Sequence, residues 1–184
     1  HRDLHSFPTR RSSDLAATDA VITFCAKVIR IVSPIVPAVK VNIAYFENYF
    51  SEGIEAYYSI IAEAQSQKLM TIGDVKRGDI GHTAQSYAMA HLQKPDFIDT
   101  DYIVTPDAIT INGYAGTDGI QPFADVAAQG GKGVFVWVRA SNPSAAQIQD
   151  FPDASGKKMY EVLADVTALI AADPKLMGDR KSVV

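Results

Sequence analysis

Hydrophobic positions along the chain follow two spacings in turn, one typical of helices and one typical of strands. From Thr18 the apolar side chains recur every three or four residues, which predicts an amphipathic helix that ends at Ser33-Pro34. Short runs rich in β-branched residues predict strands at 35–43, with regular pairing only after Pro37, and at 69–74, 108–111 and 134–138. Helical spacing predicts further helices at 50–67, around 80–88, at 118–129 and at 159–170. The chain therefore alternates helices with strands.

Helices between consecutive strands imply right-handed βαβ units and a parallel sheet. A doubly wound sheet usually carries a glycine-rich phosphate turn, and no G-x-G-x-x-G follows any predicted strand. Polar side chains instead recur where successive strands end, which is where (β/α)8 barrels place their active sites. These side chains are Lys40 and Asn42, then Asp74, Lys76 and Asp79, then Asn112, and finally Arg139 with Ser141. We therefore predict an α/β fold, a partial (β/α)8 TIM barrel with about four βα units present.

The composition is that of an ordinary globular protein. Of the 184 residues, 47% are hydrophobic and 21% are charged, and 17 Lys and Arg against 21 Asp and Glu give a formal net charge of −4. This mild acidity argues against nucleic acid or an anionic membrane as a partner. Charges at Lys27, Arg30 and Lys40 interrupt the most apolar region, so no membrane span is predicted. The single cysteine, Cys25, cannot form an internal disulfide, which favours the cytoplasm.

The two ends of the chain lack the patterns of the middle. Residues 1–15 show neither helical nor strand periodicity and contain no signal-peptide core. They resemble translated sequencing-adapter tails, as do residues 179–184, and a native disordered arm is the alternative for the first segment. We therefore expect residues 16–178 to form the partial barrel and both tails to lie outside it.

The densest group of charged side chains lies at residues 74–79, Asp-Val-Lys-Arg-Gly-Asp. In extended backbone Asp74 and Lys76 point to one face and can form an ion pair. Nearby carboxylates favour the charged form of a lysine, which gives a proton donor beside a fixed negative charge. An ordinary solvated charge cluster is the alternative, but the position after a buried strand favours a catalytic site.

Residues 74–84, DVKRGDIGHTA, closely resemble the signature of the orotidine 5'-phosphate decarboxylases, particularly the longer bacterial form. Three further segments agree with that family in order and spacing. They are VKVNIAYFE at 39–47, TINGYAG at 110–116 and RASNP at 139–143. Together these segments make the resemblance extend over essentially all of residues 18–178.

The resemblance implies a lyase that converts orotidine 5'-phosphate to uridine 5'-monophosphate (UMP) and CO2 in pyrimidine biosynthesis. Lys40, Asp74, Lys76 and Asp79 match the alternating lysine and aspartate network of the family. In that network Lys76 matches the proton donor to C6 of the pyrimidine. Decarboxylation leaves a carbanion that a preorganised cation can stabilise, so we expect neither a metal nor another cofactor.

The resemblance also implies substrate contacts and a partner subunit. Ser141 matches a serine that hydrogen-bonds the pyrimidine, and Asn112 lies in a family motif where it either touches substrate or holds the loop. The predicted substrate-binding set is Thr83, Ser141, Asn112 and Asn42. Asp79, Ile80 and Thr83 match positions that reach the partner's active site in a homodimer, and the expected location is the cytoplasm.

Two alternative functions stay open. Sugar-phosphate decarboxylases and aldol-type synthases of the same barrel superfamily share the D-x-K-x-x-D core but use magnesium, and residues 141–143 speak against them. The other alternative is a non-catalytic truncated barrel that only packs or aggregates. The family's first strand, with a ribose-binding aspartate, is expected before residue 16, and its glycine-rich phosphate loop and following arginine are expected after residue 178. We therefore expect an incomplete fragment that is inactive by itself.

Overall fold

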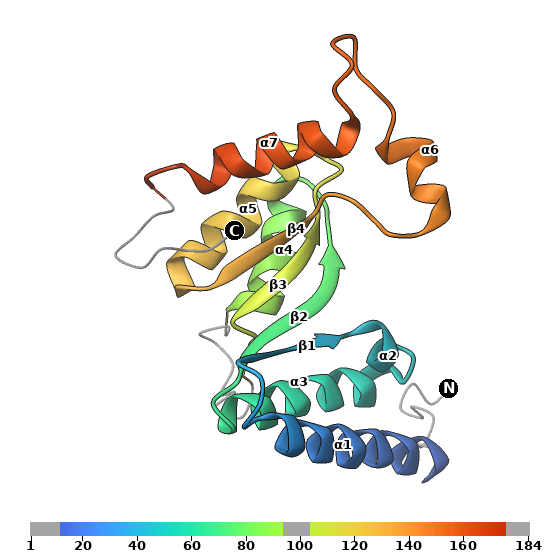
Figure 1. The fold of residues 1–184 in the computed structure, drawn as a ribbon. Coiled ribbons are helices and arrows are strands. Elements are labelled where there is room, and N and C mark those ends of the chain that lie inside the picture. The colour runs from blue at the N-terminus through green and yellow to red at the C-terminus, as the bar shows by residue number, and fades with distance from the viewer. Residues whose placement is uncertain (1–11, 94–103, 176–184) are drawn as a thin grey trace, which may run out of the picture.

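Four parallel strands form one sheet in the order in which they follow along the chain (Figure 1). The computed structural model describes residues 12–93 and 104–175. Its strands are β1 (Ala38–Asn42), β2 (Met70–Arg77), β3 (Ala108–Asn112) and β4 (Gly133–Trp137). The register places Asn42 opposite Asp74 and Asn112 opposite Trp137. Because all four strands run in the same direction, their carboxyl ends meet at one edge of the sheet.

Helices connect the strands and pack against the sheet. The long helices are α1 (Ser12–Val32), α3 (Phe50–Ser66), α4 (Gly81–Leu92), α5 (Thr117–Gly130) and α7 (Met159–Ala171). Short helical turns follow β1 and β4, namely α2 (Ala44–Glu47), the 3-10 helix η1 (Pro143–Ala145) and α6 (Ala146–Gln149). Figure 1 shows α4 and α5 on the far side of β2 to β4, whereas α1 and α3 lie together beside β1. This arrangement confirms the predicted α/β class, with the strand order of a partial (β/α)8 barrel.

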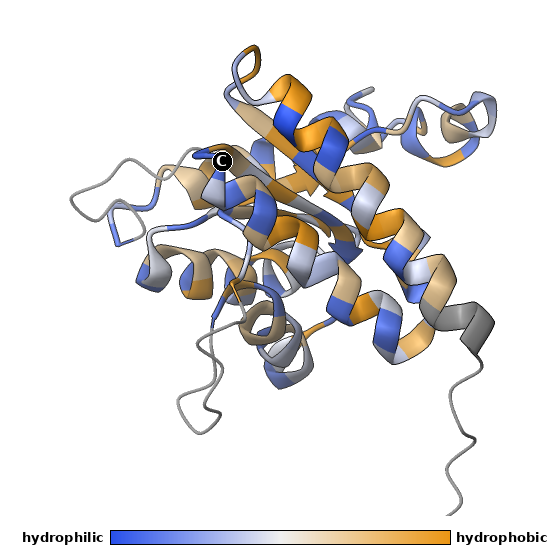
Figure 2. Ribbon diagram, turned by 90° about the horizontal axis from the view of Figure 1, so that it is seen from below, coloured by the Kyte–Doolittle hydropathy of each residue, from blue (hydrophilic) through white to orange (hydrophobic). Residues whose placement is uncertain are grey.

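The core lies between the sheet and its helices. On β3, Ile109 and Ile111 are fully buried, whereas the alternating Thr110 and Asn112 are only partly buried. Side chains of a strand alternate between its two faces, so one face of β3 supplies the core and the other carries polar groups. The largest fully buried side chains from the helices are Tyr57, Ile60, Ile61, Leu92 and Phe123. Figure 2 shows hydrophobic and hydrophilic residues alternating around the helices, as expected of helices with one face against a sheet.

The predicted helices and strands are confirmed, with differences at their ends. Helix α1 begins at Ser12 and not at Thr18, so residues 12–15 are helical although they were expected outside the fold. The rest of the first tail and residues 179–184 lie outside the described residues. Strand β2 continues to Arg77 and does not end at Asp74. The short turns α2 and α6 were not predicted, because four residues are too few to show a helical period.

The described helices can be compared with the length and hydrophobicity that a membrane span requires. None of them is long and apolar enough to cross a lipid bilayer. In α1, which includes the apolar region 20–32, charged residues interrupt the hydrophobic side chains, and part of this helix packs against α3. Ile29 of this helix is buried in the core, with Val21, Ile22 and Cys25 packed against it, whereas Phe24 and Ile31 are exposed.

Candidate active site

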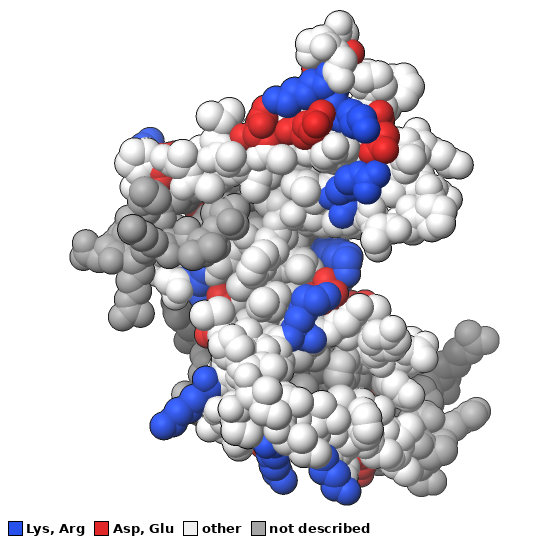
Figure 3. Space-filling model, viewed as in Figure 1, with Lys and Arg blue, Asp and Glu red and all other residues white. Residues whose placement is uncertain are grey.

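Three adjacent strands bring oppositely charged side chains together on the polar face of the sheet. Lys40 of β1 donates to Asp74 Oδ2 of β2 at 2.5 Å, and Lys76 donates to Asp74 Oδ1 at 2.6 Å. Thr110 of β3 donates its hydroxyl to the same Oδ1 at 2.8 Å. The ion pair predicted between Asp74 and Lys76 is therefore present, and Lys40 completes a carboxylate bridged by two lysines. Figure 3 shows Lys and Arg side chains gathered around acidic atoms in the hollowed middle of this face.

The carboxylate of Asp74 is the buried centre of this group. Its side chain is 3% exposed, whereas those of Lys40 and Lys76 are 55% and 42% exposed. Burial by itself would raise the pKa of Asp74, but the hydrogen bonds from Lys40, Lys76 and Thr110 outweigh it and lower the pKa to about 2. Asp74 is therefore a fixed negative charge at neutral pH, with two ammonium groups directed at it from the more open side.

The backbone beneath this cluster departs from regular strand geometry. The pairing of β2 with β3 shifts register between Gly73 and Arg77, as at a β-bulge. Lys76 has φ of +46°, a left-handed conformation that costs a residue with a side chain about 1–2 kcal/mol. The Lys76 amide donates to Thr110 Oγ1 at 3.1 Å. The bulge therefore re-aims the Lys76 side chain, and the Thr110 hydroxyl binds the Lys76 amide at this point.

Thr110 was missed as a site residue. It lies in the quoted segment 110–116, and the signal that could have found it is its alternation with Asn112 on β3. Two residues apart in a strand, both side chains point to the face opposite Ile109 and Ile111. A polar pair on the non-core face of a strand next to Asp74 was therefore readable as part of the site.

The two asparagines at the strand ends both hold the loop that follows them. Asn42 Oδ1 accepts the amide of Ala44 at 3.1 Å, and Asn112 Oδ1 accepts the amide of Tyr114 at 2.9 Å. Such a bond from a side chain to the backbone two residues on is an Asx turn. For Asn112, the interpretation as a loop-holding residue is therefore supported by the structure.

Asp79, predicted as the fourth member of the charged network, does not join it within one chain. Its Oδ1 accepts the amide of Ile80 at 2.8 Å, just before α4 begins. Ile80 is 59% exposed, and Thr83 is half-buried in the first turn of α4. Ile80 and Thr83 both line a hollow of about 780 Å³ between α4 and α5. The structure therefore gathers Lys40, Asp74 and Lys76. Asp79 instead binds the Ile80 amide, and Ile80 and Thr83 line the hollow between α4 and α5.

Ser141 is exposed on the loop after β4, and its neighbours hold that loop in place. Arg139 donates to both carboxylate oxygens of Asp150, at 3.0 and 3.2 Å from Nη2. The amide of Ala140 donates to Gln149 Oε1 at 2.7 Å. These contacts tie the Ser141 loop to the end of α6. Ser141 therefore has a defined position although no hydrogen bond to its own side chain is seen among the described residues.

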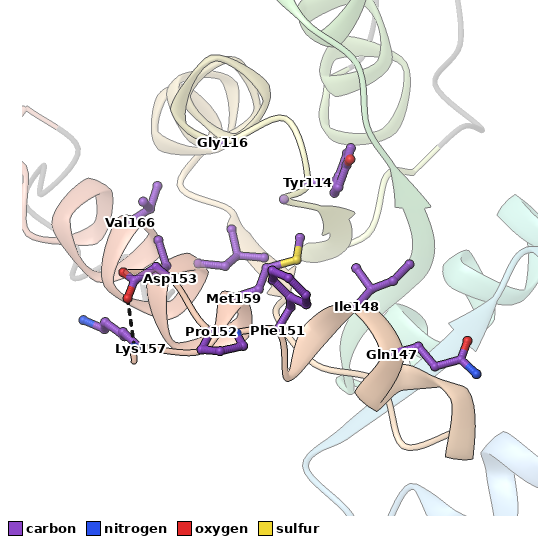
Figure 4. A pocket seen from close by; sticks show the side chains of 13 residues that line it. Tyr114, Gly116, Gln147, Ile148, Phe151, Pro152, Asp153, Lys157, Met159 and Val166 are labelled. Atoms are coloured by element: carbon purple, nitrogen blue, oxygen red, sulfur yellow. Dashed lines mark hydrogen bonds between the residues drawn. The ribbon is translucent and has the colours of Figure 1, made fainter. Parts of the chain in front are cut away.

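An apolar hollow lies away from the charged cluster. It has a volume of about 750 Å³ and is lined by residues of α6, α7, the segment between them and the loop after β3, with Ile148, Phe151, Met159 and Leu163 among them (Figure 4). Its edge is shaped by Asp153, whose carboxylate accepts the Lys157 amide at 2.9 Å. None of its lining residues belongs to the predicted catalytic set. Across residues 12–93 and 104–175, no three His, Cys, Asp or Glu side chains are grouped as a metal site would require.

The chain is similar in sequence to known proteins. A sequence model of the orotidine 5'-phosphate decarboxylase / HUMPS family matches residues 13–178. The orotidine 5'-phosphate decarboxylase of Clostridium acetobutylicum is 36% identical over 147 residues, which are 80% of this chain and 49% of that protein. The enzyme of the same name from Rhodopirellula baltica is 34% identical over 161 residues, 88% of this chain and 52% of that protein. The chain thus spans about half the length of the curated relatives it matches.

Solved structures show the same fold. The structure of Leishmania donovani OMP decarboxylase superposes with a TM-score of 0.69 at 25% identity, over 91% of this chain and 67% of that one. The orotidine 5'-monophosphate decarboxylase of Plasmodium berghei superposes with a TM-score of 0.77 at 23% identity, over 90% of this chain and 49% of that one. The sequence match, the relatives and the shared fold confirm the resemblance seen in residues 74–84. The chain belongs to the orotidine 5'-phosphate decarboxylase / HUMPS family.

Proposed function

We propose that the protein containing this chain is a carboxy-lyase that converts orotidine 5'-phosphate to UMP and CO2 in pyrimidine biosynthesis. The observation that carries the proposal is the buried carboxylate of Asp74 between the ammonium groups of Lys40 and Lys76. Such an array can bind a carboxylate substrate and deliver a proton to the carbon that loses CO2. Curated relatives named for this activity supply the substrate.

The proposed chemistry follows from the charges. The bond between C6 and the carboxylate carbon breaks, CO2 leaves, and the electron pair stays on C6. The ammonium of Lys76 stabilises that developing charge and then donates its proton to C6. Asp74 lies near the departing carboxylate, and Lys40 holds Asp74 in place. The proposal assigns no step to a metal or an organic cofactor, because the lysine supplies both the positive charge and the proton.

We further propose substrate contacts for residues around the strand ends. Ser141 is supported by its exposure and by the two ties that hold its loop. Asn42 and Asn112 each use Oδ1 for an Asx turn, which leaves the amide nitrogen to point elsewhere. Thr83 belongs to this set through the partner subunit. A cytoplasmic location is part of the same proposal, since the single cysteine needs no oxidising compartment.

The test of this function uses the product of the complete gene. It is incubated with orotidine 5'-phosphate, with and without a chelator, and UMP and CO2 are measured. A parallel reaction offers a keto sugar acid phosphate with magnesium. We expect UMP and CO2 in both reactions with orotidine 5'-phosphate. Release of CO2 from the sugar substrate alone would assign the protein to the magnesium-dependent alternative.

We propose a homodimer in which Asp79, Ile80 and Thr83 serve the partner's site. The support is that Ile80 and Thr83 line the hollow between α4 and α5, and that the Asp79 carboxylate accepts the Ile80 amide of its own chain. Mixing a Lys76→Ala chain with an Asp79→Ala chain is then expected to restore about a quarter of wild-type activity. Random pairing makes half of the dimers mixed, and each mixed dimer has one intact site out of two.

The measurement is decarboxylation after subunit exchange, with exchange verified by mass spectrometry of differently labelled chains. Each variant alone serves as the control and stays inactive. Absence of recovery despite verified exchange places Asp79 in the site of its own subunit.

A further inference from the structure

The peptide group between Val75 and Lys76 is bound on both of its sides by side chains. Its carbonyl, the oxygen of Val75, accepts a hydrogen bond from Arg77 Nη1 at 3.1 Å. Its amide, the nitrogen of Lys76, donates to Thr110 Oγ1 at 3.1 Å. Regular strands satisfy these groups from a neighbouring backbone. Here a guanidinium and a hydroxyl do so, directly before the lysine proposed as the proton donor.

Both bonds lie where the strand is irregular. The register of β2 against β3 shifts between Gly73 and Arg77. Lys76 takes φ of +46°, in the left-handed region that disfavours a side chain. A backbone conformation of this kind persists only when surrounding contacts hold it. The two side-chain bonds to the Val75–Lys76 peptide are contacts at this point, besides the bond of the Lys76 ammonium to Asp74.

The Arg77 side chain is itself held by residues of two helices. It forms an ion pair with Glu47 of α2, and its guanidinium lies 6.0 Å from the centre of the Tyr87 ring of α4. Its side chain is 26% exposed, whereas that of Lys76 is 42% exposed and is turned to Asp74. Arg77 therefore contacts helices α2 and α4, while Lys76 faces the charged cluster. The guanidinium joins these two helices to the backbone that carries Lys76.

We infer that Arg77, fixed by Glu47, is a positioning residue for Lys76. It holds the carbonyl of the preceding peptide and thereby the bulged backbone that aims the ammonium at Asp74 and at the reacting carbon. This inference rests on the proposed function for its kinetic consequence, but not for its structural one. An ion pair that merely attached α2 to the sheet would not depend on the bond to the Val75 carbonyl.

Two kinds of variant separate positioning from simple attachment. Arg77→Lys keeps a cationic donor, whereas Arg77→Gln removes the charge that pairs with Glu47. The exchange Glu47→Arg with Arg77→Glu restores an ion pair but leaves no donor at position 77 for the Val75 carbonyl. Arg139→Gln is the matched control, because it breaks a comparable pair with Asp150 that does not touch this peptide.

The first measurement follows Lys76 directly by NMR of the 184-residue chain with 15N-labelled lysine. It records the Lys76 ammonium resonance and the backbone coupling that reports φ of Lys76. Both are expected to change in Arg77→Gln and in the charge exchange, to stay close to wild type in Arg77→Lys, and to stay unchanged in Arg139→Gln. Unchanged Lys76 signals in Arg77→Gln overturn the inference, whatever substrate the protein uses.

The second measurement is kinetic, in the complete gene product with orotidine 5'-phosphate. Arg77→Gln is expected to lower kcat by about ten- to a hundredfold, because small misplacement of a reacting group has effects of this size. KM is expected to change by less than about threefold, since substrate contacts stay in place. If kcat recovers in the double variant Glu47→Arg with Arg77→Glu, the ion pair that attaches α2 is sufficient for turnover, and the inference is overturned. Lack of turnover in the wild type instead rejects the proposed function and leaves the NMR result to decide.

Discussion

Replacing Lys76 by alanine is expected to abolish CO2 release from orotidine 5'-phosphate in the complete gene product. The rate should fall by at least about a thousandfold, because the variant loses both the proton donor and the cation that faces the developing carbanion. The fold should persist, since the Lys76 side chain is 42% exposed and contributes little to the core. Steady-state decarboxylation and circular dichroism of the same preparation check both expectations.

The matched control for this variant is Lys157→Ala. The Lys157 side chain is 40% exposed and pairs with Asp165, so it resembles Lys76 in exposure and in having an acidic partner. It lies beside the apolar hollow of α7 and away from the strand ends. Full activity is expected in Lys157→Ala. Activity of Lys76→Ala within about tenfold of wild type refutes the role of proton donor.

Replacing Asp74 by asparagine is expected to lower the rate of decarboxylation and the free energy of unfolding at neutral pH. The amide has the size of the carboxylate but no charge, so Lys40 and Lys76 lose the group that fixes their ammonium positions. We expect a loss of at least about a hundredfold in decarboxylation, because small displacements of catalytic groups have costs of this order. The free energy of unfolding at pH 7 should fall by about 2 kcal/mol, the equivalent of the lowered pKa of Asp74.

The loss of stability in Asp74→Asn is expected to depend on pH in one direction. The pKa of Asp74 is lowered from 3.8 to about 2 on folding, chiefly because hydrogen bonds from the two lysines and Thr110 outweigh the opposing effect of burial. A carboxylate with a lowered pKa stabilises the folded state above the unfolded pKa, and this contribution is lost as the pH falls through the folded pKa. The difference in unfolding free energy between wild type and Asp74→Asn should therefore shrink from about pH 4 to about pH 2.

Urea unfolding across this pH range measures that difference. Asp19→Asn is the control, since Asp19 is exposed on α1. It should match the wild type at every pH. A constant difference between wild type and Asp74→Asn down to pH 2 contradicts the assignment of Asp74 as the buried charge of the cluster.

The sheet and its helices were predictable because they depend on local periodicity. Apolar residues at helical spacing mark α3 and α7, and β-branched runs mark β1 and β3. Pro37 correctly placed the start of regular pairing in β1, because proline cannot donate to a strand ladder. The end of β2 was less predictable. Its continuation to Arg77 depends on pairing with β3 beyond a register shift, which leaves no signature in the residues of β2 themselves.

The candidate site was predictable as a set of residue types at strand ends. Parallel strands bring their carboxyl ends to one edge, so Lys40, Asp74 and Lys76 could be expected near one another. The position of Asp79 could not be derived in this way, because the chain turns into α4 directly after it. The buried state of His91, whose pKa falls to about 4 chiefly through desolvation, likewise depends on which helices pack against α4.

The sequence by itself therefore determined the order of the elements, the class of the fold and the residue types of the candidate site. Only the tertiary structure decided which groups touch. Thr110 meets Asp74 across 36 residues of sequence, and Arg77 meets Glu47 across 30. The physical reason is that both contacts depend on the register of neighbouring strands and on the bulge at Lys76. These are set by packing between distant segments, whereas periodicity reports only the environment of each segment alone.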